Sequence, residues 1–163
     1  MSPETRTIEL ERRIRARPET VFAFFTDPEK YRLWQGIGAS LEPHPGGRYQ
    51  VDYTRQLHVR CCGRYLVVEP PHRIVFTWGW DPEPGLPLGI GEVSPDSTTV
   101  EITLVPDGEE TILRLRHSGL PTEEAETMHG AQWPIYLDRL ATAVAGGDPG
   151  PDQVYMMLEG GNV

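Results

Sequence analysis

A change in hydrophobic period along the 163-residue chain most constrains its fold. Six segments alternate apolar and polar residues with a period of two, as half-buried strands do; they are residues 7–16, 48–53, 58–69, 74–80, 97–105 and 111–117. Beyond them, one apolar stripe has helical spacing and consists of Trp133, Leu137, Leu140 and Val144. The pattern predicts an α+β fold in which one long C-terminal helix covers one face of an antiparallel sheet.

Two short helices are predicted between the first and second of these strands. Pro18 suits the first position of a helix, and a second helix is expected to open at Asp27-Pro28 and to run to Trp34. Pro134 is expected to kink or break the long helix, because proline has no backbone N–H to donate. The segment 81–95 is rich in proline and glycine and is expected to form one long loop.

Length and charge set the domain organisation and exclude some partners. Residues 1–147 are predicted to form a single domain and residues 148–163 a tail that contains Gly and Pro, with an apolar stretch at 154–158. The chain has 15 basic and 24 acidic residues, a net charge of −9, and no basic run. This balance argues against nucleic acid and anionic membranes as partners. Residues 119–163 hold seven acids and one base, Arg139.

The two cysteines, Cys61 and Cys62, are adjacent in a predicted strand and point to opposite faces of it. A disulfide between them would be strained, and two free thiols fit a reducing cytoplasm. No signal-peptide pattern and no apolar run long enough to span a membrane occurs in the sequence. We therefore expect a cytoplasmic protein, either a monomer or a homodimer.

Large aromatic residues gather on the strand faces expected to point at the long helix. Rings of this size leave gaps when they pack between a sheet and one helix, and a buried Trp N–H needs a partner. The pattern predicts an internal cavity, and the alternative is a solid core. The candidate ligand-binding aromatics are Trp34, Tyr49, Tyr53, Tyr65, Phe76, Trp78, Trp80 and Trp133.

Two polar residues, Arg12 and His117, share strand faces with apolar residues. An inward Arg12 would bind a ligand carboxylate or enolate, and an inward His117 would be a general acid or base. The alternative places both at strand ends, in solvent or against a carboxylate. His129 is predicted to pack within the helix and to bond to the backbone. Cys61 is either a nucleophile near His58 or a small core thiol.

Motifs for metal and cofactor binding are missing from the sequence. The five histidines lack the spacing of a metal site, and no phosphate-binding or dinucleotide-binding glycine loop occurs. We therefore expect no metal and no cofactor. No catalytic motif is recognisable, and His117 is the single candidate for a catalytic residue.

Several strings, in order, resemble one known family. They are IRARPETVFAFFTDPEKYRLW (14–34), PGGRY (45–49), GRYLVVEPPHRIVFTWGW (63–80), STTVEITL (97–104), TILRLRHSGLP (111–121) and the His129-to-Leu140 helix pattern. Together they resemble the helix-grip (START-like, Bet v 1-like, SRPBCC) superfamily, in the branch named for the activator of the heat-shock-protein-90 ATPase. The resemblance implies a curved antiparallel sheet of six to seven strands around the C-terminal helix, with a cavity for lipids, polyketides or other apolar ligands.

Three functions follow as hypotheses. The first is a ligand-binding protein that holds a hydrophobic or aromatic molecule in the cavity, with Arg12 and His117 at its polar end. The second is an aromatase/cyclase-type or hydrolase-type enzyme that uses the same cavity through His117. The third is a chaperone-ATPase-activator-like interaction module in the stress response, which would use the outer face of the sheet. The apolar stretch 154–158 would dock on a neighbouring subunit or across the cavity mouth.

Overall fold

The computed structural model describes residues 6–82 and 85–155. Met156, Met157 and Leu158, which belong to the predicted apolar stretch of the tail, lie outside the described residues. The elements in chain order are β1 (Arg6–Ile14), α1 (Pro18–Thr26), α2 (Pro28–Tyr31), β2 (Gly38–Leu41), β3 (Arg48–Asp52), β4 (Arg60–Glu69), β5 (Arg73–Trp78), β6 (Thr98–Asp107), β7 (Glu110–Leu120) and α3 (Glu123–Val144).

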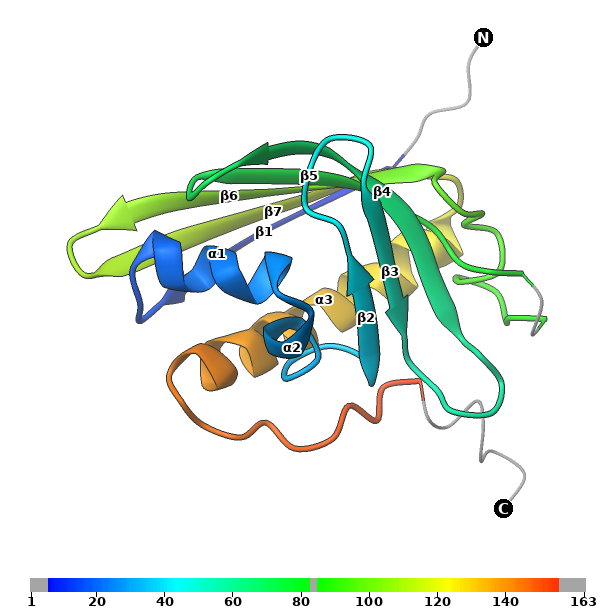
Figure 1. Ribbon diagram of the computed structural model, residues 1–163. Helices are drawn as coiled ribbons and strands as arrows, with labels where there is room; N and C mark the ends of the chain where they lie inside the picture. The colour runs from blue at the N-terminus through cyan, green and yellow to red at the C-terminus, as the bar shows by residue number, and fades with distance from the viewer. Residues whose placement is uncertain (1–5, 83–84, 156–163) are drawn as a thin grey trace, which may run out of the picture.

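The seven strands form one antiparallel sheet in the order β1-β7-β6-β5-β4-β3-β2. The sheet curves over α3, and α1 and α2 lie on the same side of it (Figure 1). This arrangement confirms the predicted helix-grip α+β fold. The strand that period-two alternation missed is β2, whose four residues (GASL) are too few and too uniformly half-buried to show a period.

The loss of alternation in the predicted strand 58–69 has a structural cause. The pairing of β4 with β5 shifts register between Tyr65 and Val67. A bulge places an extra residue in one strand and reverses which face the following side chains point to. The sequence therefore loses its period at this position although the strand continues.

The long helix begins and ends as its sequence indicates but is not broken. The Thr122 side chain caps it by accepting a hydrogen bond from the Ala125 N–H at 3.0 Å. The expectation that Pro134 breaks α3 is wrong, because the helix runs without interruption to Val144. Helix α3 packs against the sheet through Trp133, Leu137 and Leu140, and this packing offsets the one missing backbone donor.

The loop 85–95 is anchored to the core by Ile90 and Val93, which are both buried. Gly79 allows the loop to approach the strand: a Cβ at this position would lie 1.8 Å from the Ser94 carbonyl oxygen. A side chain there would force the loop away from β5. In the described part of the chain, no helix has the length and hydropathy needed to cross a membrane.

Candidate functional site

The structure brings all eight candidate aromatics into one core, where each is at most 2% exposed. Those nearest α1 and α2 pack as a solid cluster. The Tyr49 ring stacks on Phe76 with 4.0 Å between centroids, and the Trp34 ring lies 5.2 Å from Phe25. Trp34 donates its N–H to the Phe24 carbonyl at 2.9 Å. This side of the interior is a packed core with its Trp34 donor satisfied.

The other aromatics surround α3 and meet two histidines. Trp78 lies 5.2 Å from Trp133 and 5.5 Å from Trp80, measured between ring centroids. His117 and His129 lie 5.3 Å apart, from β7 and α3 respectively. The sheet and the helix therefore each contribute histidine and tryptophan to the same contact.

His117 is the centre of a hydrogen-bond chain that we call the histidine relay, formed by Trp133, His117, Thr98 and the Trp78 carbonyl. Trp133 donates its N–H to His117 Nδ1 at 3.0 Å, so Nδ1 carries no proton. His117 Nε2 then donates to Thr98 Oγ1 at 2.8 Å, and Thr98 donates to the Trp78 carbonyl at 2.7 Å. Both ring nitrogens are engaged, and each donor in the chain has an acceptor.

The relay decides between the alternatives for His117. The side chain is fully buried, so the alternative that places it in solvent at a strand end is wrong. Burial lowers its pKa well below the ordinary 6.5, which keeps the ring neutral. A neutral ring with both nitrogens bonded has no lone pair or proton free for a substrate. In this arrangement His117 links the sheet to the helix.

His129 also links the helix to the sheet, but here the histidine belongs to the helix and the tryptophan to the sheet. Its Nδ1 donates to the Ala125 carbonyl at 2.7 Å, which confirms the predicted backbone bond within the helix. Its Nε2 accepts the Trp80 N–H at 3.1 Å. Burial lowers the pKa of His129 as well. A sheet histidine thus binds a helix tryptophan, and a helix histidine binds a sheet tryptophan.

Trp78 is the exception among the four tryptophans. Its indole N–H is buried and has no hydrogen-bond partner among the described residues. Trp78 also lines a small space between the sheet, α3 and the tail, with a volume of about 10 Å³, close to the minimum for one water molecule. We call it the tail pocket. Its walls are Gln35, Trp78, His129, Gln132, Trp133, Tyr136 and Tyr155.

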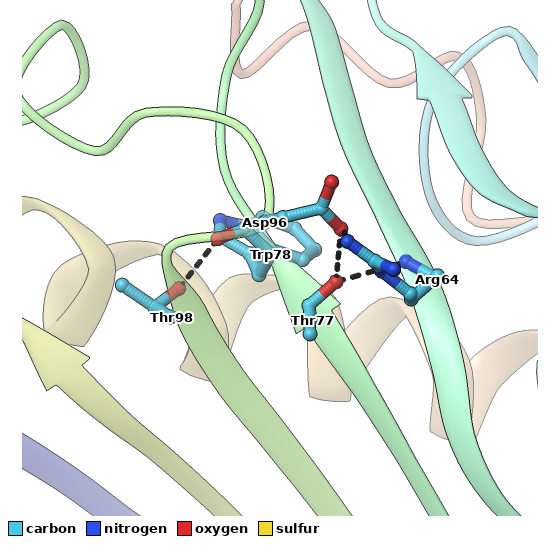
Figure 2. Close-up of polar contacts among 5 residues, drawn as sticks. All are labelled: Arg64, Thr77, Trp78, Asp96 and Thr98. Atoms are coloured by element: carbon cyan, nitrogen blue, oxygen red, sulfur yellow. Dashed lines mark hydrogen bonds and ion pairs between the residues drawn. The ribbon is translucent and has the colours of Figure 1, made fainter. Parts of the chain in front are cut away.

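Polar contacts hold the strand that carries Trp78 on both sides (Figure 2). On one side, the Thr98 hydroxyl bonds to the Trp78 carbonyl. On the other, Thr77 donates to Asp96 at 2.5 Å and accepts from the Arg64 N–H at 2.9 Å. The end of β5, and with it the Trp78 indole, is therefore fixed in place.

A directed chain of hydroxyl and amide groups reaches the pocket from α2. Tyr49 and Tyr31 share a short hydrogen bond, Tyr31 donates to Gln35 Oε1 at 2.7 Å, and Gln35 Nε2 donates to Tyr53 at 2.7 Å. Burial raises the pKa of Tyr31, Tyr49 and Tyr53 well above 10, so the three hydroxyls remain protonated. Each group in this series donates to the next. The Tyr53 oxygen therefore accepts from Gln35, and the Tyr53 hydroxyl hydrogen can be donated to a further acceptor.

Arg12 lies apart from the pocket. Its guanidinium reaches the exposed edge of α3, where it pairs with Asp138 at 3.2 Å and bonds to the Pro134 carbonyl at 3.4 Å. The predicted alternative in which Arg12 meets a carboxylate near solvent is the one observed. Cys61 is fully buried and burial raises its thiol pKa, which fits the core-thiol alternative. The described residues contain no cluster of three or more His, Cys, Asp or Glu able to hold a metal.

A larger hollow of about 460 Å³ lies on the opposite face of the sheet, where a chaperone-type partner would dock. Its charges already pair with each other or with neighbours. Arg114 bonds to Glu11 at 3.0 Å, and Arg73 bonds to Glu101 at 2.6 Å. Two buried side-chain donors lack a partner among the described residues, Arg12 Nε and the Trp78 indole N–H. The Trp78 donor lies in the tail pocket, and we place the candidate site there.

Sequence reasoning found Trp78 and Trp133 but missed the remaining walls of the pocket. The missed residues are Gln35, Gln132, Tyr136 and Tyr155, while His129 was predicted only to pack. The apolar stretch at 154–158 was the signal for Tyr155. Whether the stretch 154–158 docks across a cavity mouth or on a neighbouring subunit stays a prediction, since residues 156–158 lie outside the described residues.

Known proteins resemble this chain in sequence and fold. The family described as Activator of Hsp90 ATPase homolog 1-like protein matches residues 15–145. An AHSA1-like protein of Rhizobium etli is 42% identical, with 92% of this chain and 88% of that chain covered and a TM-score of 0.69. Comparison with curated proteins gave no match.

Two further solved structures are similar at lower identity. CalU16 from Micromonospora echinospora is 26% identical, with 97% of this chain and 85% of that chain covered and a TM-score of 0.69. DynU16, a protein in the dynemicin biosynthetic locus, is 24% identical, with 88% and 48% covered and a TM-score of 0.70. The likeness to DynU16 shows the fold alone.

Proposed function

This chain belongs to the Activator of Hsp90 ATPase homolog 1-like family, and from that premise we propose that it binds an uncharged, planar aromatic molecule in the tail pocket. The observation that carries the proposal is the buried Trp78 N–H without an acceptor. Leaving such a donor unmatched costs about 1–3 kcal/mol. A ligand that supplies an acceptor oxygen recovers this energy, so the site favours a molecule with a carbonyl, ether or hydroxyl group.

The walls of the pocket favour a neutral ligand. The seven lining residues are aromatic rings, amides and a histidine, and none carries a formal charge, because burial lowers the pKa of His129. A charged group loses its hydration on entering such a site and finds no opposite charge there. Carboxylates are therefore poor ligands, and Arg12, at the exposed edge of α3, does not change this.

Aromatic ligands fit the pocket better than acyl chains. Rings bind to aromatic walls in stacked or edge-to-face contacts, and Trp78, Trp133 and Tyr136 offer such contacts. A drug-sized ligand needs on the order of 300 Å³, so the present space of about 10 Å³ has to enlarge before a ligand of either kind enters.

Calorimetric titration with matched probes tests the proposal. We expect 2-naphthol to bind more tightly than naphthalene, because its oxygen accepts the Trp78 N–H, and we expect decanoate not to bind. In Trp78→Phe, 2-naphthol should bind about fivefold more weakly, since one neutral hydrogen bond contributes about 1 kcal/mol. Naphthalene should keep its affinity in this variant. Equal loss of affinity for both probes, or tighter binding of decanoate, would refute the assignment.

A further inference from the structure

Residues 148–155, which we call the tail strap, contribute Tyr155 to the wall of the tail pocket. After α3 ends, the strap turns back and runs along the helix toward the end of β2 (Figure 1). Arg139, the single base among residues 119–163, holds its first half. The guanidinium donates to three successive strap carbonyls: Pro149 at 3.1 Å, Gly150 at 2.8 Å and Pro151 at 3.4 Å.

Asp152 anchors the second half of the strap. Its carboxylate is 3% exposed and accepts three hydrogen bonds. The donors are the Gly36 N–H at 2.7 Å, the Tyr136 hydroxyl at 3.1 Å and the Val154 N–H at 3.0 Å. A buried carboxylate is tolerated only where several donors satisfy it, so these bonds define one docked position. The strap is therefore a specific contact with α3 and the end of the α2–β2 connection.

These anchors place Tyr155 in the wall of the pocket. Its ring is 3% exposed and lies 4.9 Å from the Tyr53 ring and 5.0 Å from the Trp80 ring. Its hydroxyl donates a short hydrogen bond to Gln132 Oε1. Burial raises its pKa well above 10, so the group is a neutral phenol. An aromatic ring held by aromatic neighbours and one amide is the arrangement expected for a bound aromatic ligand.

We propose that Tyr155 is an internal stand-in for the ligand: a neutral phenol-like aromatic molecule takes its place between Tyr53, Trp80 and Gln132, and the strap undocks when that molecule binds. The inference rests on the proposed function and names the ligand class and its competitor. Withdrawal of the Tyr155 ring opens a void of benzene size beside the free Trp78 donor, and a void of about 150 Å³ is enough to bind benzene in other proteins. Ligand binding and strap docking then exclude each other.

Titration of strap variants with 2-naphthol tests the competition. Tyr155→Ala empties the subsite. Asp152→Ala releases the strap and also removes the acceptor of the Tyr136 hydroxyl, so Tyr136→Phe, which lacks that hydroxyl, is measured beside it. We expect Tyr155→Ala and Asp152→Ala both to bind 2-naphthol about tenfold more tightly than the wild type, because the ligand no longer competes with a docked strap. Gln153→Ala is the matched control, since Gln153 is an exposed residue of the same strap, and should bind like the wild type.

Amide exchange in the wild-type protein gives an independent readout. The Gly36 N–H donates to Asp152 across the contact between the strap and the α2–β2 connection, and saturating 2-naphthol should increase its exchange rate. Unchanged exchange at saturation, or equal affinity of the wild type and both variants, would overturn the inference and leave the proposed function standing. If neither the wild type nor the two variants bind 2-naphthol, the proposed function is wrong and the inference falls with it.

Discussion

The histidine relay and the tail pocket lie in the same interior but use their polar atoms differently. In the relay, every donor from Trp133 to Thr98 meets an acceptor, and the chain ends on a backbone carbonyl. In the tail pocket, the Trp78 N–H has no partner among the described residues, and Tyr155 of the strap forms one wall. The relay therefore joins α3 to the sheet, while the pocket contains a buried donor without an acceptor among the described residues.

The largest difference between the two regions should appear when each loses an aromatic ring. Trp133→Ala removes a buried ring and leaves His117 Nδ1 without its donor, so we expect the free energy of unfolding to fall by about 3–5 kcal/mol. Tyr155→Ala should cost less than half as much, because the strap can undock while the sheet and α3 stay packed. Urea denaturation of both variants measures this. Equal losses would mean that the strap belongs to the cooperative core.

A second test makes the same chemical change at two neighbouring tryptophans. Trp80→Phe leaves His129 Nε2 buried without a donor, whereas Trp78→Phe removes an N–H that has no acceptor. We expect Trp80→Phe to destabilise the protein by about 1–3 kcal/mol more than Trp78→Phe. Chemical denaturation of the pair measures the difference. A larger loss for Trp78→Phe would show that its indole N–H is satisfied in solution.

The fold could be predicted from the sequence because its signals are local. Alternation over five or more residues marks every strand except β2, and the stripe from Trp133 to Val144 marks α3. The inward side of Trp78 and His117 follows from the same period. What remained open was which buried polar atoms find partners, since alternation gives the face of a residue but not its neighbour across the core.

The tail pocket depends on contacts between segments that the period does not connect. Tyr155 meets Gln132 across 23 residues of chain, and Asp152 meets Gly36 across 116. Neither Tyr155 nor Asp152 lies in a segment with a periodic apolar pattern, so packing against the rest of the fold decides where they lie. The bonds of His117 depend likewise on Trp133, 16 residues away on another element. This is why the sequence left open whether His117 is an inward acid or base or lies at a strand end in solvent or against a carboxylate.

The smallest expected effect is on the pH dependence of stability, and it again separates the relay from the pocket. Burial lowers the pKa of His117 well below 6.5 and lowers that of His129 less. Below pH 6.5 the unfolded chain therefore binds protons that the folded chain does not, and stability falls as the pH decreases. Each histidine contributes a slope of up to about 1.4 kcal/mol per pH unit until its folded pKa is reached.

Replacing either histidine by glutamine, which does not titrate, removes its share of this slope. We expect His117→Gln to flatten the loss of stability below pH 6.5 over a wider pH range than His129→Gln, because His117 in the relay resists protonation to lower pH. Urea denaturation at several pH values between about 6.5 and 4.5 measures both slopes against the wild type. A wild-type slope in His117→Gln would mean that His117 accepts a proton in the folded state near its ordinary pKa. The Trp133 N–H bond to Nδ1 would then be broken in solution. The relay, like the tail pocket, would contain a buried tryptophan N–H without an acceptor.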